Sequence, residues 1–224
     1  MKLVVQTLAS MVSGVLFFGL ALFLPAWTFD YWQSWVFIAV FMVATLIPSI
    51  YLAVKHPAAL QRRLKAGPAA ETRPVQRVVM TATLLAVVAL LALSAVDHRL
   101  GWSSVPRPIV ILGDVLVGIG LLVAQLVVVQ NDHAAATIRV ESSQELVSTG
   151  LYGVVRHPMY LGALVMMLGT PLALDSLWGL VVLIPASAAL TARIVDEEKM
   201  LTEELAGYGE YTRRVGYRLL PGVW

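Results

Sequence analysis

Long apolar runs alternate with short polar segments along almost the whole chain. Four of the runs, Leu3–Leu24, Trp32–Val54, Val78–Val96 and Ile109–Val129, each contain about 20 residues, which is the length a helix needs to cross a bilayer. Within lipid no water is present to bond the backbone N–H and C=O groups, so these groups must form hydrogen bonds with one another. A helix achieves this within a single apolar run of this length. The pattern therefore predicts four transmembrane helices in the first part of the chain.

The last apolar region is divided in two. Tyr160–Leu174 and Leu177–Ile194 flank the polar pair Asp175 and Ser176, and the first of these arms is short for a full span. Pro171 together with Asp175 favours a tight turn between two helices. We therefore predict an all-α polytopic membrane helix bundle, with four spans, a C-terminal transmembrane helical hairpin and a cytosolic cofactor pocket.

Three polar segments lie between or after the apolar runs: Lys55–Arg77, Gln130–Pro158 and Asp196–Trp224. Alternation of the spans places all three on one side of the membrane, and the loops on the other side hold only Arg99 and Arg107 as strong bases. Basic residues concentrate on the cytoplasmic side of membrane proteins. We expect the N-terminus and these segments to be cytoplasmic, and the basic first segment is also compatible with contact to lipid headgroups.

The composition supports an integral membrane protein. Hydrophobic residues make up 58% of the 224 residues and charged residues 13%, whereas soluble domains hold about 25% charged residues. The length suits one compact domain, which we divide into a three-span N-terminal region (1–108) and a C-terminal region (109–224). The Ala-, Val- and Leu-rich spans resemble those of a prokaryotic inner-membrane protein.

Several classes of function are disfavoured. The chain has no cysteine, which excludes thiolate catalysis and cysteine-ligated zinc, and its four histidines are scattered without metal-ligand spacing. The basic segment lacks interleaved aromatic residues, so we expect no nucleic-acid partner. A glycine-rich phosphate loop is also missing, which argues against a Rossmann-type soluble methyltransferase. The expected partners are the lipid bilayer and a lipophilic small-molecule or lipidated substrate.

The strongest candidate site is the stretch from Gly150 to Gly162, GLYGVVRHPMYLG, where a polar segment meets an apolar run. It brings a cation (Arg156), an imidazole (His157) and a phenol (Tyr160) to the membrane edge. Polar groups at such a position are costly unless they have a function. We therefore expect this stretch to form part of a binding or catalytic site.

The same stretch resembles the signature of the integral-membrane methyltransferases typified by isoprenylcysteine carboxyl methyltransferase. The similarity covers roughly the C-terminal half of the chain, at Gln130-Asn131, Leu146-Val147, Gly150, Tyr152, Arg156-His157-Pro158, Tyr160, Gly162, Arg193, Glu197-Glu198, Leu201, Tyr208, Tyr211 and Pro221. The resemblance implies an S-adenosylmethionine-dependent methyltransferase that acts on a lipophilic acceptor, with a carboxylate of the isoprenylcysteine type as one candidate. The chain departs from the family in the segment 132–145, which is several residues longer than in the eukaryotic enzymes.

The resemblance also implies roles for individual residues. Arg193 matches a substrate-contacting arginine, and we take Arg193 and Arg156 as the catalytic candidates. The implied cofactor contacts are Gln130, Gln144, Glu145, Leu146, Val147, Tyr152, His157, Pro158, Met159, Tyr160, Glu197 and Glu198. The residues themselves leave a second interpretation open, because Arg193 and Glu197 share a helix face and can form a simple helix-end salt bridge.

The chemical nature of the acceptor decides whether the reaction needs a base. A carboxylate acceptor is already ionised near neutral pH and needs none, whereas an amine or thiol acceptor requires one, for which His157 or Glu198 is a candidate. Membrane sterol reductases, which use NADPH, look similar in their last helices, and a non-catalytic membrane scaffold also stays possible. Asp114, in the middle of a predicted span, is interpreted as a packing residue bonded to a neighbouring group.

Overall fold

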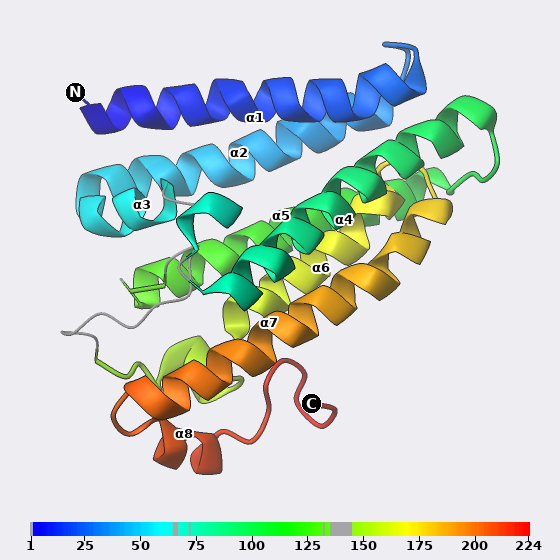
Figure 1. Cartoon of the computed structure of the whole chain (residues 1–224). Coiled ribbons are helices and arrows are strands. Elements are labelled where there is room, and N and C mark those ends of the chain that lie inside the picture. The colour runs from blue at the N-terminus through cyan, green and yellow to red at the C-terminus, as the bar shows by residue number, and fades with distance from the viewer. Residues whose placement is uncertain (1, 65–66, 72, 132, 135–144) are drawn as a thin grey trace.

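The computed structural model describes residues 2–64, 67–71, 73–131, 133–134 and 145–224. Within these ranges all regular elements are helical: α1 (Lys2–Ala26), α2 (Trp32–Lys55), α3 (Pro57–Leu64), η1 (Pro68–Ala70), α4 (Pro74–Leu100), α5 (Arg107–Gln130), η2 (Gly150–Gly153), α6 (Pro158–Ala173), η3 (Trp178–Val182), α7 (Leu183–Glu204) and α8 (Tyr208–Arg214). The long helices lie side by side in one bundle, with α1 and α2 on one flank and α3 and α8 at the same end (Figure 1). The predicted division at residue 108 stays a prediction.

Five helices are long and apolar enough to cross a membrane: α1 from Gln6 onward, α2, α4, α5 and the continuous stretch Trp178–Glu204. The shorter α6 has 16 residues and is also apolar. It forms a hairpin with α7 through the turn at Asp175 and Ser176. The predicted polytopic all-α bundle, with four spans and a C-terminal hairpin, is therefore confirmed.

Several helix boundaries differ from the predicted ones. α4 begins at Pro74 instead of Val78, and α7 continues through Asp196 to Glu204, where a span ending at Ile194 was expected. The Asp196 carboxylate is held by Arg73 and Gln76 at the beginning of α4, which lets this acidic residue lie inside a long helix.

Helices α5 and α6 pack with their backbones almost in contact. A Cβ atom added to Gly162 would lie 2.6 Å from the carbonyl oxygen of Gly120 and 3.2 Å from the backbone nitrogen of Ala124. Gly169 has the same relation to Gly113, since its added Cβ would lie 2.6 Å from the Gly113 oxygen. Small residues such as Gly120 and Ala124 allow this approach. The packing fixes where the beginning of α6 lies.

The end of the bundle away from α3 and α8 is tied together by two aspartates. Asp97, at the end of α4, is fully buried and accepts hydrogen bonds from the side chains of Ser103 and Ser176 and from backbone nitrogens. Asp175, at the α6–η3 turn, accepts a 2.9 Å bond from Gln33 of α2. Satisfied buried polar groups of this kind hold the connecting loops in one arrangement.

Candidate active site

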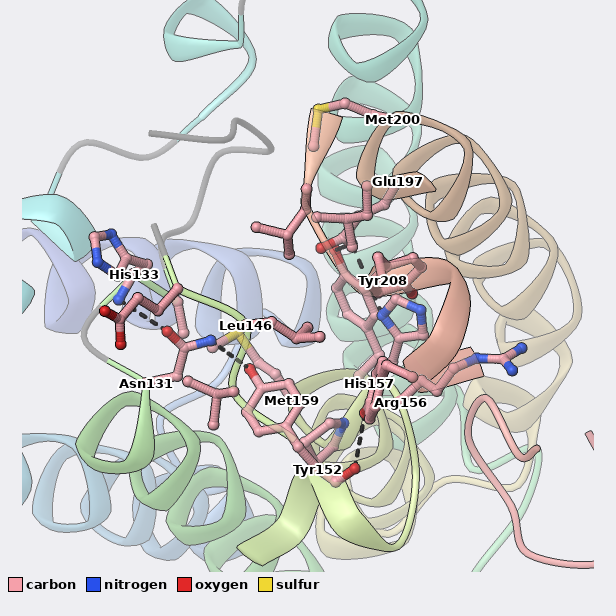
Figure 2. Close-up of a pocket in the computed structure, with 18 residues that line it drawn as sticks. Asn131, His133, Leu146, Tyr152, Arg156, His157, Met159, Glu197, Met200 and Tyr208 are labelled. Atoms are coloured by element: carbon pink, nitrogen blue, oxygen red, sulfur yellow. Dashed lines mark hydrogen bonds and ion pairs between the residues drawn. The ribbon is translucent and has the colours of Figure 1, made fainter. Parts of the chain in front are cut away.

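A pocket opens at the bundle end that carries α3 and α8 (Figure 2). Its walls come from the segment after α5, from the loop before α6, from the beginning of α6, and from α7 and α8. The lining residues are Asn131, His133, Ala134, Glu145, Leu146, Val147, Tyr152, Arg156, His157, Pro158, Met159, Tyr160, Glu197, Met200, Leu201, Leu205, Tyr208 and Tyr211. The pocket is therefore built mainly from residues of the two C-terminal polar segments and the helix between them.

Tyr160 brings the first polar group of the pocket into position. It lies in the first turn of α6, two residues after Pro158, which suits the first position of a helix. Its hydroxyl donates a 2.6 Å hydrogen bond to Oε2 of Glu197 on α7 and accepts a 3.0 Å bond from Nε of Arg193. The pocket thus contains a carboxylate whose position is set by a phenol, which is in turn held by an arginine.

Arg193 itself is enclosed by protein. Its Nη1 donates to Oε1 of Gln76 at 3.0 Å, and its Nη2 donates to Oε1 of Glu71, also at 3.0 Å. The exposed fraction of Arg193 is 6% and that of Glu71 is 1%. Arg193 does not line the pocket, so the substrate contact predicted for it stays a prediction. In this structure its charge meets Glu71 and its direct neighbour in the site is Tyr160.

Glu198 is the centre of a second charged cluster behind the pocket wall. Its Oε1 accepts a 2.7 Å bond from Nε of Arg156 and lies 3.2 Å from Nε2 of His157. Its Oε2 accepts a 2.7 Å bond from Nε of Arg218. Glu198 is buried and is not a lining residue, so the cofactor contact predicted for it stays a prediction. It orients His157, whose ring lies against Tyr160 with centroids 5.6 Å apart.

Arg156 also holds the segment after α8. Its Nη1 donates to the carbonyl oxygens of Thr212, Val215 and Gly216, at 3.5, 3.1 and 3.4 Å. The backbone nitrogens of Arg156 and His157 donate to the carbonyl oxygens of residues 217 and 218, both at 2.9 Å. The C-terminal segment is therefore fastened along the Arg-His-Pro turn and closes one side of the site.

Two side-chain amides at the end of α5 hold the loop that precedes α6. Gln130 accepts a 3.0 Å bond from the backbone nitrogen of Leu151 through Oε1 and packs against Gly150, whose φ of 61° lies in the left-handed region. Asn131, the next residue, donates a 3.2 Å bond from Nδ2 to the hydroxyl of Tyr152. Asn131 lines the pocket, whereas Gln130 supports the loop from behind. The predicted cofactor contact of Gln130 stays a prediction.

Three tyrosines close the pocket on the α8 side. Burial raises the pKa of Tyr152 and of Tyr211 to about 12, and raises that of Tyr208 further. All three phenols therefore stay protonated near neutral pH. The Tyr211 hydroxyl donates a 2.7 Å bond to the carbonyl oxygen of Tyr152. The buried hydroxyl of Tyr208, by contrast, has no hydrogen-bond partner among the residues that the structure describes.

Ten predicted site residues line the pocket: Glu145, Leu146, Val147, Tyr152, Arg156, His157, Pro158, Met159, Tyr160 and Glu197. Gln144 lies outside the described residues. Four further lining residues carried the resemblance without being named as site residues: Asn131, Leu201, Tyr208 and Tyr211. The sequence analysis did not single out the lining residues His133, Ala134, Met200 and Leu205. Helical spacing gave a signal for some of them, because Met200 and Leu201 follow Glu197 by three and four residues and so share its face of α7.

Comparison with known proteins bears on this region. Residues 108–209 match the family model described as phospholipid methyltransferase. The match runs from the first turn of α5 into α8 and contains every pocket-lining residue except Tyr211. This family of integral-membrane methyltransferases is related to the isoprenylcysteine carboxyl methyltransferases, so the resemblance predicted from the sequence is confirmed.

A curated protein outside the methyltransferases also matches. A stretch of 91 residues, 39% of the chain, is 35% identical to part of the Delta(14)-sterol reductase of Mus musculus. The matched stretch covers 22% of that reductase, so the similarity concerns a small part of the longer protein. It is compatible with the reductase alternative, without favouring it over methyl transfer.

The lining fits the chemistry of S-adenosylmethionine. A sulfonium and an ammonium group call for carboxylates, which Glu197 and Glu145 offer. A purine ring calls for apolar and aromatic surface, which Leu201, Leu205 and the tyrosines that line the pocket supply. The Tyr208 hydroxyl offers a buried donor that a polar atom of a ligand would satisfy.

Proposed function

We propose that this protein is an S-adenosylmethionine-dependent methyltransferase that acts on a lipophilic acceptor. The observation that carries the proposal is the Tyr160–Glu197 pair, held at 2.6 Å inside a pocket that the phospholipid methyltransferase region builds at one end of a membrane bundle. When bound, the cofactor would supply an electrophilic methyl group on its sulfonium. We place the pocket on the cytoplasmic side of a prokaryotic plasma membrane, following the charge distribution of the loops.

The residues of the chain would act mainly by positioning. Tyr160 donates to Glu197 and thereby fixes a carboxylate where the positive part of the cofactor would be held. Leu146 packs with Leu205, Tyr208 and Tyr211 in an apolar cluster beside the pocket, which keeps water from that side. Correct placement of two reactants is worth roughly 7–11 kcal/mol of the barrier. For a direct transfer between two bound molecules this contribution is the principal one that the protein supplies.

The acceptor would reach the pocket from the bilayer. His157 is the group best placed to take a proton from an amine or thiol acceptor, because it lines the pocket while Nε2 lies 3.2 Å from Oε1 of Glu198. The carboxylate would stabilise the imidazolium form, as in other carboxylate–histidine pairs. A carboxylate acceptor would need no such step, because it is already ionised near neutral pH.

The reductase alternative is supported by the similarity to the sterol reductase of Mus musculus. An NADPH site needs a group of cations for the 2′-phosphate. Arg156 is the one arginine among the described lining residues, and its donors already serve Glu198 and the carbonyl groups after α8. The acidic lining therefore suits a cationic cofactor better than a phosphorylated one.

Transfer of a labelled methyl group tests the proposal. Purified wild-type protein in lipid nanodiscs would be incubated with methyl-labelled S-adenosylmethionine and a total lipid extract, and the organic phase would be counted. We expect label in the organic phase with wild type and at least about tenfold less with Glu197→Gln. Oxidation of NADPH with a sterol acceptor, together with absence of label, would establish the reductase function instead.

A further inference from the structure

The short helix α3 carries an arginine on its inner side. Ala59 and Leu60 face the protein, with exposed fractions of 1% and 3%. Arg63 follows them by four and three residues, so it lies on the same face of the helix. Its Nη1 atom is buried and has no hydrogen-bond partner among the residues that the structure describes. Burial also lowers the pKa of Arg63, which reflects the cost of removing the guanidinium from water.

A buried guanidinium nitrogen without a partner sets Arg63 apart from two other arginines of this protein. Arg63 is half-buried, whereas Arg156 and Arg193 are buried and each contacts a carboxylate and further oxygen atoms. Arginine stays protonated in proteins, so a buried arginine retains its charge and requires an anion or several acceptors. The described residues supply no partner for the Arg63 Nη1 atom, and an oxygen-rich anion would complete its contacts.

The position of α3 indicates where this anion comes from. Helix α3 begins two residues after the end of α2, which is a membrane-spanning candidate, so it lies where a bilayer changes from acyl chains to headgroups. Ala59 and Leu60 form one apolar cluster with Leu52 of α2 and Val128 of α5. Anionic phosphate groups of lipids are concentrated at this level, and arginine binds phosphate through two parallel N–H donors.

The same cluster connects α3 with the pocket. Ala134 and Met159 pack against the cluster of α3, and both also line the pocket. A lipid held near Arg63 would therefore lie beside the pocket wall that Met159 forms. Figure 1 shows α3 at the same end of the bundle as α8, which closes the pocket on its other side.

We propose that Arg63 is a binding site for the phosphate group of a membrane phospholipid, which it holds at the bundle end beside the pocket. The site differs from the pocket in position and in charge, since its binding group is a cation on α3 and the pocket contains Glu145 and Glu197. The proposal concerns lipid binding and does not depend on the methyl transfer proposed above.

The test uses the full chain, purified in detergent, and three probes measured by calorimetry: dihexanoylphosphatidylglycerol, dihexanoylglycerol and inorganic phosphate. Arg63→Gln would be compared with Arg62→Gln, which removes the same charge from the adjacent position of α3. We expect wild type to bind the phospholipid, with affinity about tenfold lower in Arg63→Gln and changed less than about twofold in Arg62→Gln. Dihexanoylglycerol and inorganic phosphate should bind much more weakly to every variant.

A second measurement keeps the test independent of folding. Removal of an incompletely paired buried charge should leave the melting temperature of the lipid-free protein unchanged or higher in Arg63→Gln, while the rise in melting temperature caused by the phospholipid is lost. An equal loss of phospholipid affinity in Arg63→Gln and Arg62→Gln would show that only the general surface charge matters, which would overturn the proposal. Binding of inorganic phosphate as strong as that of the phospholipid, or absence of phospholipid binding to wild type, would overturn it as well.

Discussion

Arg193 and Glu71 form a buried ion pair, with Nη2 and Oε1 3.0 Å apart although the residues are 122 positions apart in the sequence. The pair joins the segment before α4 to the helix that carries Glu197 and Glu198. Because Arg193 also donates to the Tyr160 hydroxyl, the pair holds the phenol that positions the Glu197 carboxylate. A charge pair outside the pocket thus determines the geometry inside it.

Loss of either member of this pair should destabilise the protein strongly. Glu71→Ala and Arg193→Ala each leave one buried charge without its partner, at a cost of about 3–5 kcal/mol in the free energy of unfolding. The double variant should be less destabilised than the sum of the two, which a double-mutant cycle in a denaturant titration measures. Arg107→Ala, at an exposed position, is the control. Strictly additive effects would contradict the pairing.

Tyr208 and Tyr211 should respond oppositely to loss of the hydroxyl group. Tyr208→Phe removes a buried hydroxyl that has no partner among the described residues, so stability of the ligand-free protein should be unchanged or higher. Its affinity for S-adenosylhomocysteine should fall about fivefold, the value of one neutral hydrogen bond. Calorimetry and thermal unfolding check both effects. A loss of stability with unchanged affinity would assign Tyr208 a purely structural role.

Tyr211→Phe provides the comparison for Tyr208→Phe. It removes the 2.7 Å bond to the carbonyl oxygen of Tyr152, so the free energy of unfolding should fall by about 1 kcal/mol. The two variants lose the same atom from neighbouring rings of α8. Equal changes in stability would show that the two hydroxyl groups have equivalent environments, contrary to the structure.

Glu198 should control the attachment of the C-terminal segment. Glu198→Gln keeps the shape of the side chain but weakens its bonds to Arg156 and Arg218, because they lose a charged acceptor. Backbone amides of residues 215–224 should then exchange their hydrogens about tenfold faster, which mass spectrometry measures. The exposed Glu210→Gln is the control. Unchanged exchange in Glu198→Gln would mean that this carboxylate does not hold the segment.

Substitution of two glycines of α5 by alanine should affect stability differently, because only one of them lies in the contact with α6. A Cβ atom at Gly118 would meet only Val40, at 3.8 Å, so Gly118→Ala should be neutral or stabilising by up to about 1 kcal/mol. A Cβ atom at Gly120 would lie 2.6 Å from the backbone nitrogen of Met166, so Gly120→Ala should destabilise by about 1–3 kcal/mol. Unfolding titrations compare the two, and equal effects would contradict the close backbone packing.

The spans were predictable because hydropathy decides them locally. A run such as Trp32–Val54 has to be a helix in lipid whatever its neighbours, and α2 covers Trp32–Lys55. Helix ends near the pocket were harder, because they depend on distant partners. The continuation of α7 past Ile194 needs Arg73 and Gln76 to hold Asp196, and no local pattern contains that information.

The candidate site also has a part that the sequence predicts and a part that depends on distant contacts. The stretch around Arg156 and His157 could be found from the clustering of polar groups at a membrane edge. The environment of Arg193 could not, because Glu71 lies in a basic loop where a single acid resembles an ordinary surface residue. The helix α3 was not predicted either. It has only eight residues, which are too few for a helical periodicity of apolar positions to be recognised.

The central claim is that the pocket binds S-adenosylmethionine through the carboxylate that Tyr160 positions. The most direct test is calorimetric titration of S-adenosylhomocysteine into the purified protein, with Glu197→Gln and, as control, the exposed Glu203→Gln of the same helix. The account predicts saturable binding of one molecule per chain, at least about tenfold weaker in Glu197→Gln and unchanged in Glu203→Gln. Absence of binding to the folded wild type, or equal affinity in all three proteins, would contradict it.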